Sequence, residues 1–297
     1  MGNNLLSFLT PADKRFSLQF MPMQGGRMEI IMIKMIAMDF DWTIVDHSKQ
    51  EQSEKVGREF IDAMNRFIKN GGHAGIVSGR VWWNFEFEMK AMGVDWGNPF
   101  PDFLIAREAY IYHLKEHEYI EEKDYNTDMN ARVMRFNRKI AHNMDSILDL
   151  CEKEGIRVTN FITYGDFATE IHVEKEDADR AMELVNNFIT TYFSDGAVHR
   201  NGTAITVYYK PAGKGNTLLA AAEIFGIKPC EILAIGDNYN DISMIDSKLG
   251  FIGACVGNAD DNIKKIVKSG GGYVGEGVAF RGILDILGQV KKDGLID

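Results

Sequence analysis

Two acidic side chains, two residues apart, give the first sign of chemistry in this chain. Asp39 and Asp41 stand in the pentapeptide DFDWT, directly after an apolar run that is typical of a buried strand. On an extended chain these side chains face the same way, where like charges repel unless a metal or a reacting phosphorus uses them. Phosphoryl transfer would use the pair, because one carboxylate can attack phosphorus while the other moves a proton.

Three further segments contain the other groups that such a reaction needs. They are VSGR with Ser78, KPAGKGNTL with Lys214, and GDNYND with Asp237, Asn240 and Asp241. Asp237 offers a second carboxylate, which together with Asp39 suits the hard oxygen ligation of magnesium. A lysine and a hydroxyl can hold the non-bridging oxygens of the phosphate as charge redistributes.

The two aspartates of DFDWT must differ in pKa to play different roles. We expect a metal on Asp39 and a less charged environment around Asp41, so that the pKa of Asp41 lies above that of Asp39. Asp41 would then protonate the leaving alcohol and afterwards activate a water molecule.

Alternating apolar and amphipathic segments must position these groups. Patterns of strand or helix type follow one another over residues 30–40, 53–72, 73–80, 215–227, 231–241 and 249–259. This alternation predicts an α/β fold with a Rossmann-like parallel sheet core and covering helices. The segments DFD, SGR and GDNYND each follow a predicted strand, and the carboxyl ends of parallel strands are where such sheets bind ligands.

The middle of the chain has a different pattern of helix-type and strand-type segments, which predicts an inserted α+β module. Its segments are a long helical stretch over 129–155, strands over 158–165 and 167–174, a helix over 177–193 and a strand over 202–210. We therefore expect an N-terminal leader segment over 1–29, a catalytic core over 30–118 and 207–297, and an α+β cap domain over 119–206.

The four motifs, in this order, resemble those of the haloacid dehalogenase superfamily, and the inserted module and the GDNYND form resemble its Cof-like branch. By this resemblance Asp39 is the nucleophile and a magnesium ligand, and Asp41 is the acid/base that also gives the metal its backbone carbonyl. Asp237 is a further metal ligand, and Asp241 supports the surroundings of the metal or Lys214. The expected phosphate-binding residues are Thr43, Ser78, Gly79, Lys214 and Asn240.

Two positions depart from the family pattern. Trp42 stands where the family usually has glycine, and AREAYIY, residues 106–112, stands where a strand beginning with Asn-Gly is common. Neither change removes a catalytic group. Both affect the expected substrate, because the indole of Trp42 would narrow the pocket or stack on a substrate ring. The loop with Tyr164, Asp166 and Phe167 is a weaker candidate for substrate contact than for a plain hairpin turn.

Composition limits the classes of binding partner and the cellular compartment that we expect for this chain. The net charge of -10 and the lack of clustered Lys and Arg argue against a nucleic-acid partner, and no apolar stretch is long enough to span a bilayer. The three widely spaced cysteines fit buried thiols in a reducing cytosol. The histidines, His199 among them, show no ligand pairing and are interpreted as structural or surface residues, and Arg80 as a structural partner of backbone or carboxylates.

The sequence as a whole predicts a cytoplasmic enzyme, a magnesium-dependent phosphatase that forms a phospho-aspartate at Asp39. Its expected substrates are small phosphorylated metabolites, with sugar phosphates favoured, and no protein partner is implied. Two alternatives stay open. A sugar phosphomutase would yield an isomer in place of free phosphate. A non-enzymatic sensor of a phosphorylated ligand is opposed by the presence of Asp41, since a binder needs no acid/base.

Overall fold

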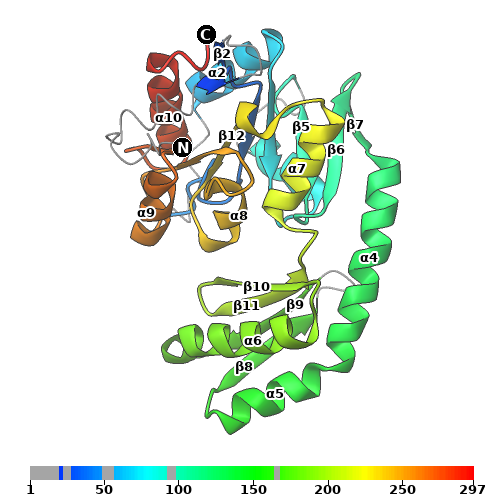
Figure 1. Cartoon of the computed structure of the whole chain (residues 1–297). Helices are drawn as coiled ribbons and strands as arrows, with labels where there is room; N and C mark the ends of the chain where they lie inside the picture. The colour runs from blue at the N-terminus through cyan, green and yellow to red at the C-terminus, as the bar shows by residue number, and fades with distance from the viewer. Residues whose placement is uncertain (1–19, 23–27, 49–56, 92–97, 164–167) are drawn as a thin grey trace, which may run out of the picture.

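The structure of the protein, a computed structural model, describes residues 20–22, 28–48, 57–91, 98–163 and 168–297. A large sheet lies in the upper part of Figure 1 and a smaller sheet in the lower part. In spatial order the large sheet contains β14 (Tyr273–Val274), β13 (Ile252–Cys255), β12 (Ile232–Gly236), β3 (Met35–Met38), β4 (His73–Val77), β5 (Phe103–Ala106), β6 (Tyr110–Lys115) and β7 (Glu118–Glu121). The pairs from β14 to β5 are parallel, whereas β6 and β7 complete an antiparallel meander.

Helices cover both faces of the large sheet, because alternate residues of its buried strands point to opposite sides. Ile36 and Met38 of β3 pack on one face, and Met35 and Ala37 pack on the other. The first face is covered by α2 (Arg58–Lys69), α3 (Trp82–Ala91) and α10 (Phe280–Lys292). The second face is covered by α7 (Lys214–Ile224), α8 (Ile242–Ile245) and α9 (Asp261–Ser269). This three-layer arrangement confirms the predicted α/β class.

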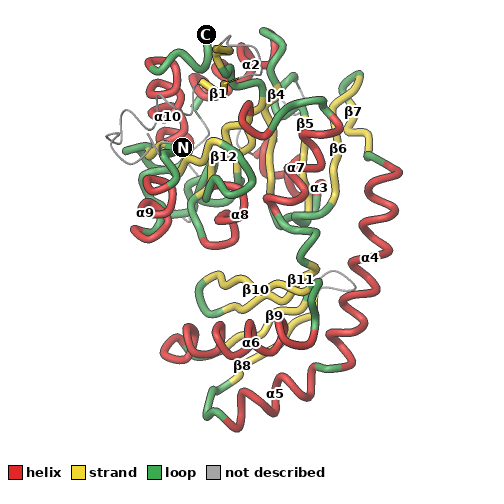
Figure 2. The backbone as a smooth tube through the Cα atoms, viewed as in Figure 1, coloured by secondary structure: helices red, strands yellow, loops and turns green. Residues whose placement is uncertain are grey.

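The middle of the chain forms a second unit with a hydrophobic core of its own. Its antiparallel sheet has the order β10 (Gly196–Asn201), β11 (Ala204–Tyr209), β9 (Thr169–Val173), β8 (Val158–Thr163). Three helices pack with it: α4 (Lys123–His142), α5 (Met144–Lys153) and α6 (Ala178–Tyr192). Helix α4 runs from the edge of the large sheet down to this unit, as Figure 2 shows. The expected domain boundaries and the role of this unit as a cap stay predictions.

Several predicted elements differ from the observed ones. The run 30–40 is not one strand: β3 is short, and the amides of Ile33 and Lys34 donate to the carbonyls of Leu295 and Glu231 instead of a strand ladder. The helical stretch 129–155 is two helices, because the chain leaves helical geometry at Asn143 with φ -111°. Strand β10 was not expected at all.

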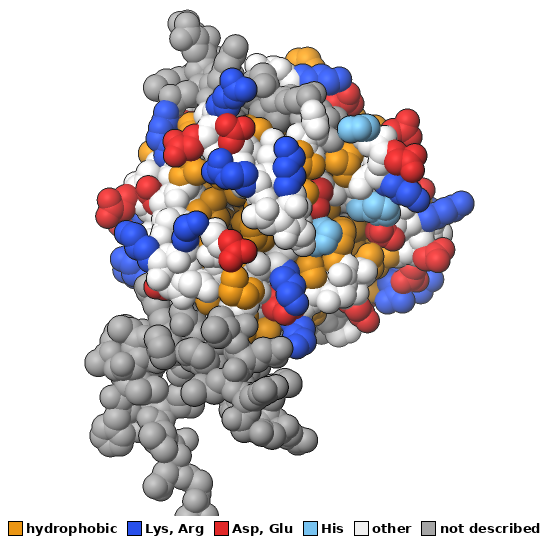
Figure 3. Space-filling view, turned by 90° about the horizontal axis from the view of Figure 1, so that it is seen from above, with side chains coloured by type: hydrophobic (Ala, Val, Ile, Leu, Met, Phe, Trp, Pro, Cys, Tyr) orange, Lys and Arg blue, Asp and Glu red, His pale blue; other side chains and the backbone are white. Residues whose placement is uncertain are grey.

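The N-terminal part of the chain was expected to be a leader over 1–29. Of it, the described residues form β1 (Phe20–Pro22), which pairs antiparallel with β2 (Met28–Ile30). The remaining residues of that expectation, and the loop with Tyr164, Asp166 and Phe167, lie outside the described residues. Within the described ranges, no helix combines the length and the apolar character that crossing a membrane requires. On the face seen in Figure 3, Lys and Arg side chains are interspersed with Asp and Glu.

Candidate active site

Asp39 and Asp237 follow two neighbouring parallel strands, β3 and β12. The order of the sheet reverses at this pair, since β4 and β5 continue from β3 on one side and β13 and β14 from β12 on the other. Such a reversal is where open α/β sheets form a ligand crevice. The amide of Asp39 donates to the carbonyl of Ile235 at 2.9 Å, which fixes the first carboxylate against the second strand.

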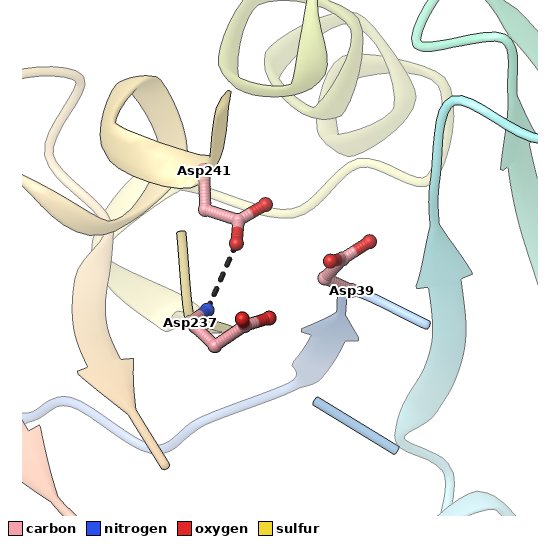
Figure 4. A group of neighbouring side chains, drawn as sticks. All are labelled: Asp39, Asp237 and Asp241. Atoms are coloured by element: carbon pink, nitrogen blue, oxygen red, sulfur yellow. Dashed lines mark hydrogen bonds between the residues drawn. The ribbon is translucent and has the colours of Figure 1, made fainter. Parts of the chain in front are cut away.

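A third carboxylate, that of Asp241, completes the group in Figure 4. One ligand atom from each of Asp39, Asp237 and Asp241 lies within 4.8 Å of the others, and all three residues are buried. The Oδ2 of Asp241 accepts the amide N–H groups of Asp237 at 2.8 Å and Asn238 at 3.0 Å. Asp241 therefore fixes the turn that presents Asp237.

Lys214 binds two of these carboxylates at once. Its Nζ lies 2.6 Å from Oδ1 of Asp39 and 2.6 Å from Oδ1 of Asp241, and its side chain is 1% exposed. Burial alone would lower the pKa of Lys214, but the charges of Asp241 and Asp39 outweigh burial and raise it. The lysine is therefore a cation that stays protonated, placed at the first residue of α7 by Gly213, whose φ of +106° favours glycine.

This donor set fits a divalent cation. Three buried carboxylates share one ammonium group, which leaves negative charge without compensation. Burial raises the pKa of Asp39, and burial and the Asp241 charge raise the pKa of Asp237 to about 7. A bound cation would reduce the repulsion between these carboxylates without their protonation. Magnesium prefers oxygen donors of this kind. Asp39 and Asp237 are the residues that would hold it, because both oxygens of Asp241 already have partners.

Asp41 is held differently from the expectation. Arg80 binds its carboxylate in bidentate fashion, with Nε 2.7 Å from Oδ2 and a terminal nitrogen 2.7 Å from Oδ1. In addition, Nε2 of His47 lies 2.7 Å from Oδ1. Burial would raise the pKa of Asp41, but the hydrogen bonds and charge of Arg80, followed by those of His47, lower it. The expected less charged environment of Asp41 is therefore wrong, whereas the expected order of the two pKa values, which assumed a metal on Asp39, stays a prediction. The expectation that Arg80 binds a carboxylate is confirmed.

The expected phosphate-binding residues fall into two groups. Ser78, Gly79, Lys214 and Asn240 line one cavity of about 490 Å³ together with Asp39, Asp41 and Asp237. Thr43 does not line this cavity: its buried hydroxyl donates to Oδ1 of Asp237 at 2.6 Å, so it orients that carboxylate instead of facing a phosphate.

The cavity also has walls that the sequence did not suggest. Residues of the second unit, on β9, β10 and β11, face the aspartates of the large sheet; they include Glu170, His199, Asn201, Thr206 and Tyr208. Burial lowers the pKa of His199, so the side chain presents a neutral imidazole to the cavity. The interpretation of His199 as a structural or surface residue is wrong, because the pairing of β10 with β11 brings it to the site.

Both departures from the family pattern lie at the cavity. Trp42 has φ +61°, lines the cavity and is 40% exposed, with its ring edge-on to His47 at 5.4 Å between centroids. Arg107 and Glu108, between β5 and β6, have φ of +51° and +56° and also line it. A glycine or Asn-Gly would adopt these conformations at lower cost. The departure at AREAYIY was thus a signal for Glu108, a site residue that the sequence analysis did not name.

Comparison with known proteins places this site in a family. A family model described as haloacid dehalogenase-like hydrolase matches residues 100–279. The chain belongs to this family. The match includes the Lys214 segment and GDNYND, while DFDWT and VSGR precede it. The geometry above joins all four segments of this family member around one cavity.

Individual relatives extend the comparison. A phosphoglycolate phosphatase of Methanospirillum hungatei is 35% identical over 121 residues, which make up 38% of this chain and 46% of that protein. The chain therefore spans about half of the length of this relative. Phosphoglycolate phosphatase 1 of Saccharolobus solfataricus is 24% identical over 88% of this chain and 97% of its own length. The solved structure of a sucrose-phosphatase from Synechocystis, in complex with sucrose and phosphate, has a TM-score of 0.65 at 14% identity, covering 88% of this chain and 99% of that one. This last likeness establishes the fold.

Proposed function

We propose that this protein is a magnesium-dependent phosphatase that hydrolyses small phosphorylated metabolites, with sugar phosphates favoured, through a phospho-aspartate at Asp39. One observation carries the proposal. The carboxylate of Asp39 lies buried beside Asp237 and bound to Lys214, in a cavity of about 490 Å³ that also contains Asp41. This is the arrangement that an in-line attack on phosphorus requires. The phosphatase names of the relatives agree with it.

In the first step a carboxylate oxygen of Asp39 forms a bond to phosphorus, and the bond from phosphorus to the ester oxygen breaks. The leaving oxygen takes a proton from Asp41. Lys214, Ser78 and Asn240 stabilise the non-bridging oxygens as charge redistributes on them. When bound at Asp39, Asp237 and the Asp41 backbone carbonyl, magnesium would supply charge neutralisation between the phosphate and the nucleophile.

In the second step a water oxygen forms a bond to the phosphorus of the phospho-aspartate while Asp41 accepts a proton from that water. The bond from phosphorus to the Asp39 oxygen breaks, which restores the Asp39 carboxylate and releases inorganic phosphate. The ion pair with Arg80 suits Asp41 for this second role, because it favours the ionised carboxylate. For the first role Asp41 must gain a proton. Arg80 also contacts Glu88, 3.3 Å from its other terminal nitrogen, so it would keep a carboxylate partner when Asp41 is protonated.

The second unit would act as a cap over the site. Glu170, His199 and Thr206 reach the same cavity as the aspartates, so substrate enclosed there would contact both units. Enclosure would exclude bulk water from the phospho-aspartate except for the attacking molecule. We accordingly propose cap and core boundaries close to Lys123 and Tyr209, where α4 begins and β11 ends.

The decisive test compares wild type with Asp39→Asn, using release of inorganic phosphate from p-nitrophenyl phosphate and a panel of sugar phosphates, with magnesium or with EDTA. We expect release only from wild type with magnesium, and a circular dichroism spectrum of Asp39→Asn like that of wild type. Phosphate release by the purified variant would refute the covalent role of Asp39. Formation of a phosphate-ester isomer without free phosphate would replace hydrolysis by mutase chemistry.

A further inference from the structure

Glu108 is a buried acidic side chain that the proposed reaction does not use. It is 8% exposed, and it lines the cavity between Gly79 and Asn240. Its Oε1 accepts a long hydrogen bond of 3.4 Å from the amide of Asn240. In the part of the chain that the structure describes, its Oε2 has no hydrogen-bond partner. A carboxyl oxygen without a protein partner, facing a cavity, is available to accept a hydrogen bond from a ligand.

The backbone of Glu108 holds this side chain firmly in place. Its amide donates to the carbonyl of Ser78 at 2.9 Å, and its carbonyl accepts from the amide of Gly213 at 2.8 Å and the hydroxyl of Thr217 at 2.7 Å. The residue therefore joins the SGR turn to the start of α7, the two segments expected to bind phosphate. Its φ of +56° is a strained conformation for a non-glycine residue, so a glutamate at this position costs backbone conformational free energy.

A second polar group faces the cavity near Glu108. The imidazole of His199 has no hydrogen bond within the described residues, and its only ring contact there is with Tyr208, at 4.9 Å between centroids. Its imidazole lies under the electrostatic influence of Glu108 first, then of Lys214 and Glu170. One acceptor and one neutral donor or acceptor are thus available beside the expected phosphate site.

The charges in this part of the cavity disfavour an anionic leaving group. The cations Lys214 and Arg80 are bound to Asp39, Asp241 and Asp41. Arg107 lines the cavity as well, and it also lines a separate hollow with Trp82 and Tyr110. Among the charged side chains that line the cavity, acidic ones therefore outnumber basic ones, and Glu108 and Glu170 are two of the acidic ones.

We propose that Glu108, with His199 beside it, recognises a hydroxyl group next to the phosphate ester of the substrate and excludes substrates that carry a carboxylate there. The inference rests on the proposed phosphatase function and narrows its substrate class to phosphates of neutral, hydroxyl-bearing compounds. A hydroxyl can donate to the free Oε2 of Glu108 and interact with the imidazole of His199. A carboxylate has no hydrogen to donate to Glu108, and its negative charge is repelled by that of Glu108 in an enclosed site.

Two substrates of equal length test this selectivity: 2-hydroxyethyl phosphate and phosphoglycolate, which differ only in a hydroxymethyl or a carboxylate group. We expect wild type to prefer 2-hydroxyethyl phosphate in kcat/KM by about tenfold or more, as one charge contact in an enclosed site implies. Glu108→Gln should reduce this preference by about tenfold, because glutamine keeps the size of the side chain and removes its charge. The control is Glu118→Gln, an exposed residue of β7, which should leave the ratio unchanged.

The ratio separates recognition from folding, because a purely structural role of Glu108 would lower kcat/KM for both substrates together. An unchanged ratio in Glu108→Gln would overturn the inference, and so would a wild type that cleaves phosphoglycolate as well as 2-hydroxyethyl phosphate, even if the variant does not fold. Hydrolysis of p-nitrophenyl phosphate by wild type with magnesium decides the underlying function separately. Absence of that hydrolysis would overturn the proposed function and the inference with it.

Discussion

Replacing Lys214 by methionine tests the charge balance of the site most directly. The ammonium group is almost fully buried and lies 2.6 Å from a carboxylate oxygen of both Asp39 and Asp241. Methionine fills a similar volume without charge, so the change leaves two buried carboxylates without their cation. Breaking a buried ion pair in this way costs about 3–5 kcal/mol of folding free energy. We expect Lys214→Met to lose that amount at neutral pH in EDTA, and to lose phosphatase activity.

The same loss should depend on pH in a defined direction. Burial already raises the pKa of Asp39 in the folded protein, and Lys214 opposes that rise. Without the lysine the folded-state pKa of Asp39 rises further above its unfolded value. A carboxyl group of this kind binds its proton more tightly when folded, so the stability it contributes is present at low pH and is lost as the pH rises through the folded pKa. The deficit of Lys214→Met relative to wild type should therefore be larger at pH 8 than at pH 5.

Equilibrium urea unfolding followed by tryptophan fluorescence measures both effects, because Trp82 packs against the core of the large sheet and Trp42 lines the cavity. The matched control is Lys90→Met. Its ion pair with Glu86 has the same chemistry at an exposed position, with the lysine side chain 63% exposed. The control should change stability by about 1 kcal/mol or less. A change of that size in Lys214→Met, independent of pH, would refute the view that Lys214 balances buried carboxylates.

Other predictions concern single groups of the site and the core. Thr43→Val removes the hydroxyl that orients Asp237, and we expect the magnesium concentration for half-maximal activity to rise about 10–100-fold, with an unchanged value counting against that role. Gly75→Ala would place a Cβ 2.4 Å from the carbonyl oxygen of Phe103 on the adjacent strand, so thermal unfolding should show a loss of about 1–3 kcal/mol or more. Trp42→Gly removes the strain of a φ of +61° at a non-glycine residue, and its described ring contact is with His47. We expect the variant to gain about 1 kcal/mol in free energy of unfolding. A net loss would show that packing of the indole outweighs the backbone strain.

The order of the four motifs and the α/β class followed from the sequence, because both depend on local patterns. A buried parallel strand reads as an apolar run, and a polar segment directly after it marks the carboxyl end of that strand. Asp39 and Asp237 could therefore be assigned to one edge of a sheet before the structure was known. Their strands are adjacent, as β3 and β12.

The exact partners of each side chain did not follow from local patterns. Nothing in DFDWT shows that Arg80 binds Asp41 in bidentate fashion or that Thr43 turns its hydroxyl to Asp237. Gly215 is a further case: a Cβ there would lie 2.3 Å from the carbonyl oxygen of Ser243, so this glycine allows α7 to pack closely against α8. Such contacts join segments far apart in the chain, and only the folded arrangement fixes which of several possible partners is nearest.

The sequence by itself determined which residues could carry phosphoryl chemistry, because that depends on residue type and on position relative to a strand end. Only the tertiary structure decided what surrounds a substrate there. Glu108 reaches the site because the turn after β5 meets the start of α7, and His199 because β10 pairs with β11 and faces the core. Substrate selectivity depends on charges and hydrogen-bonding groups brought together across two units, and no periodicity along the chain encodes their distances.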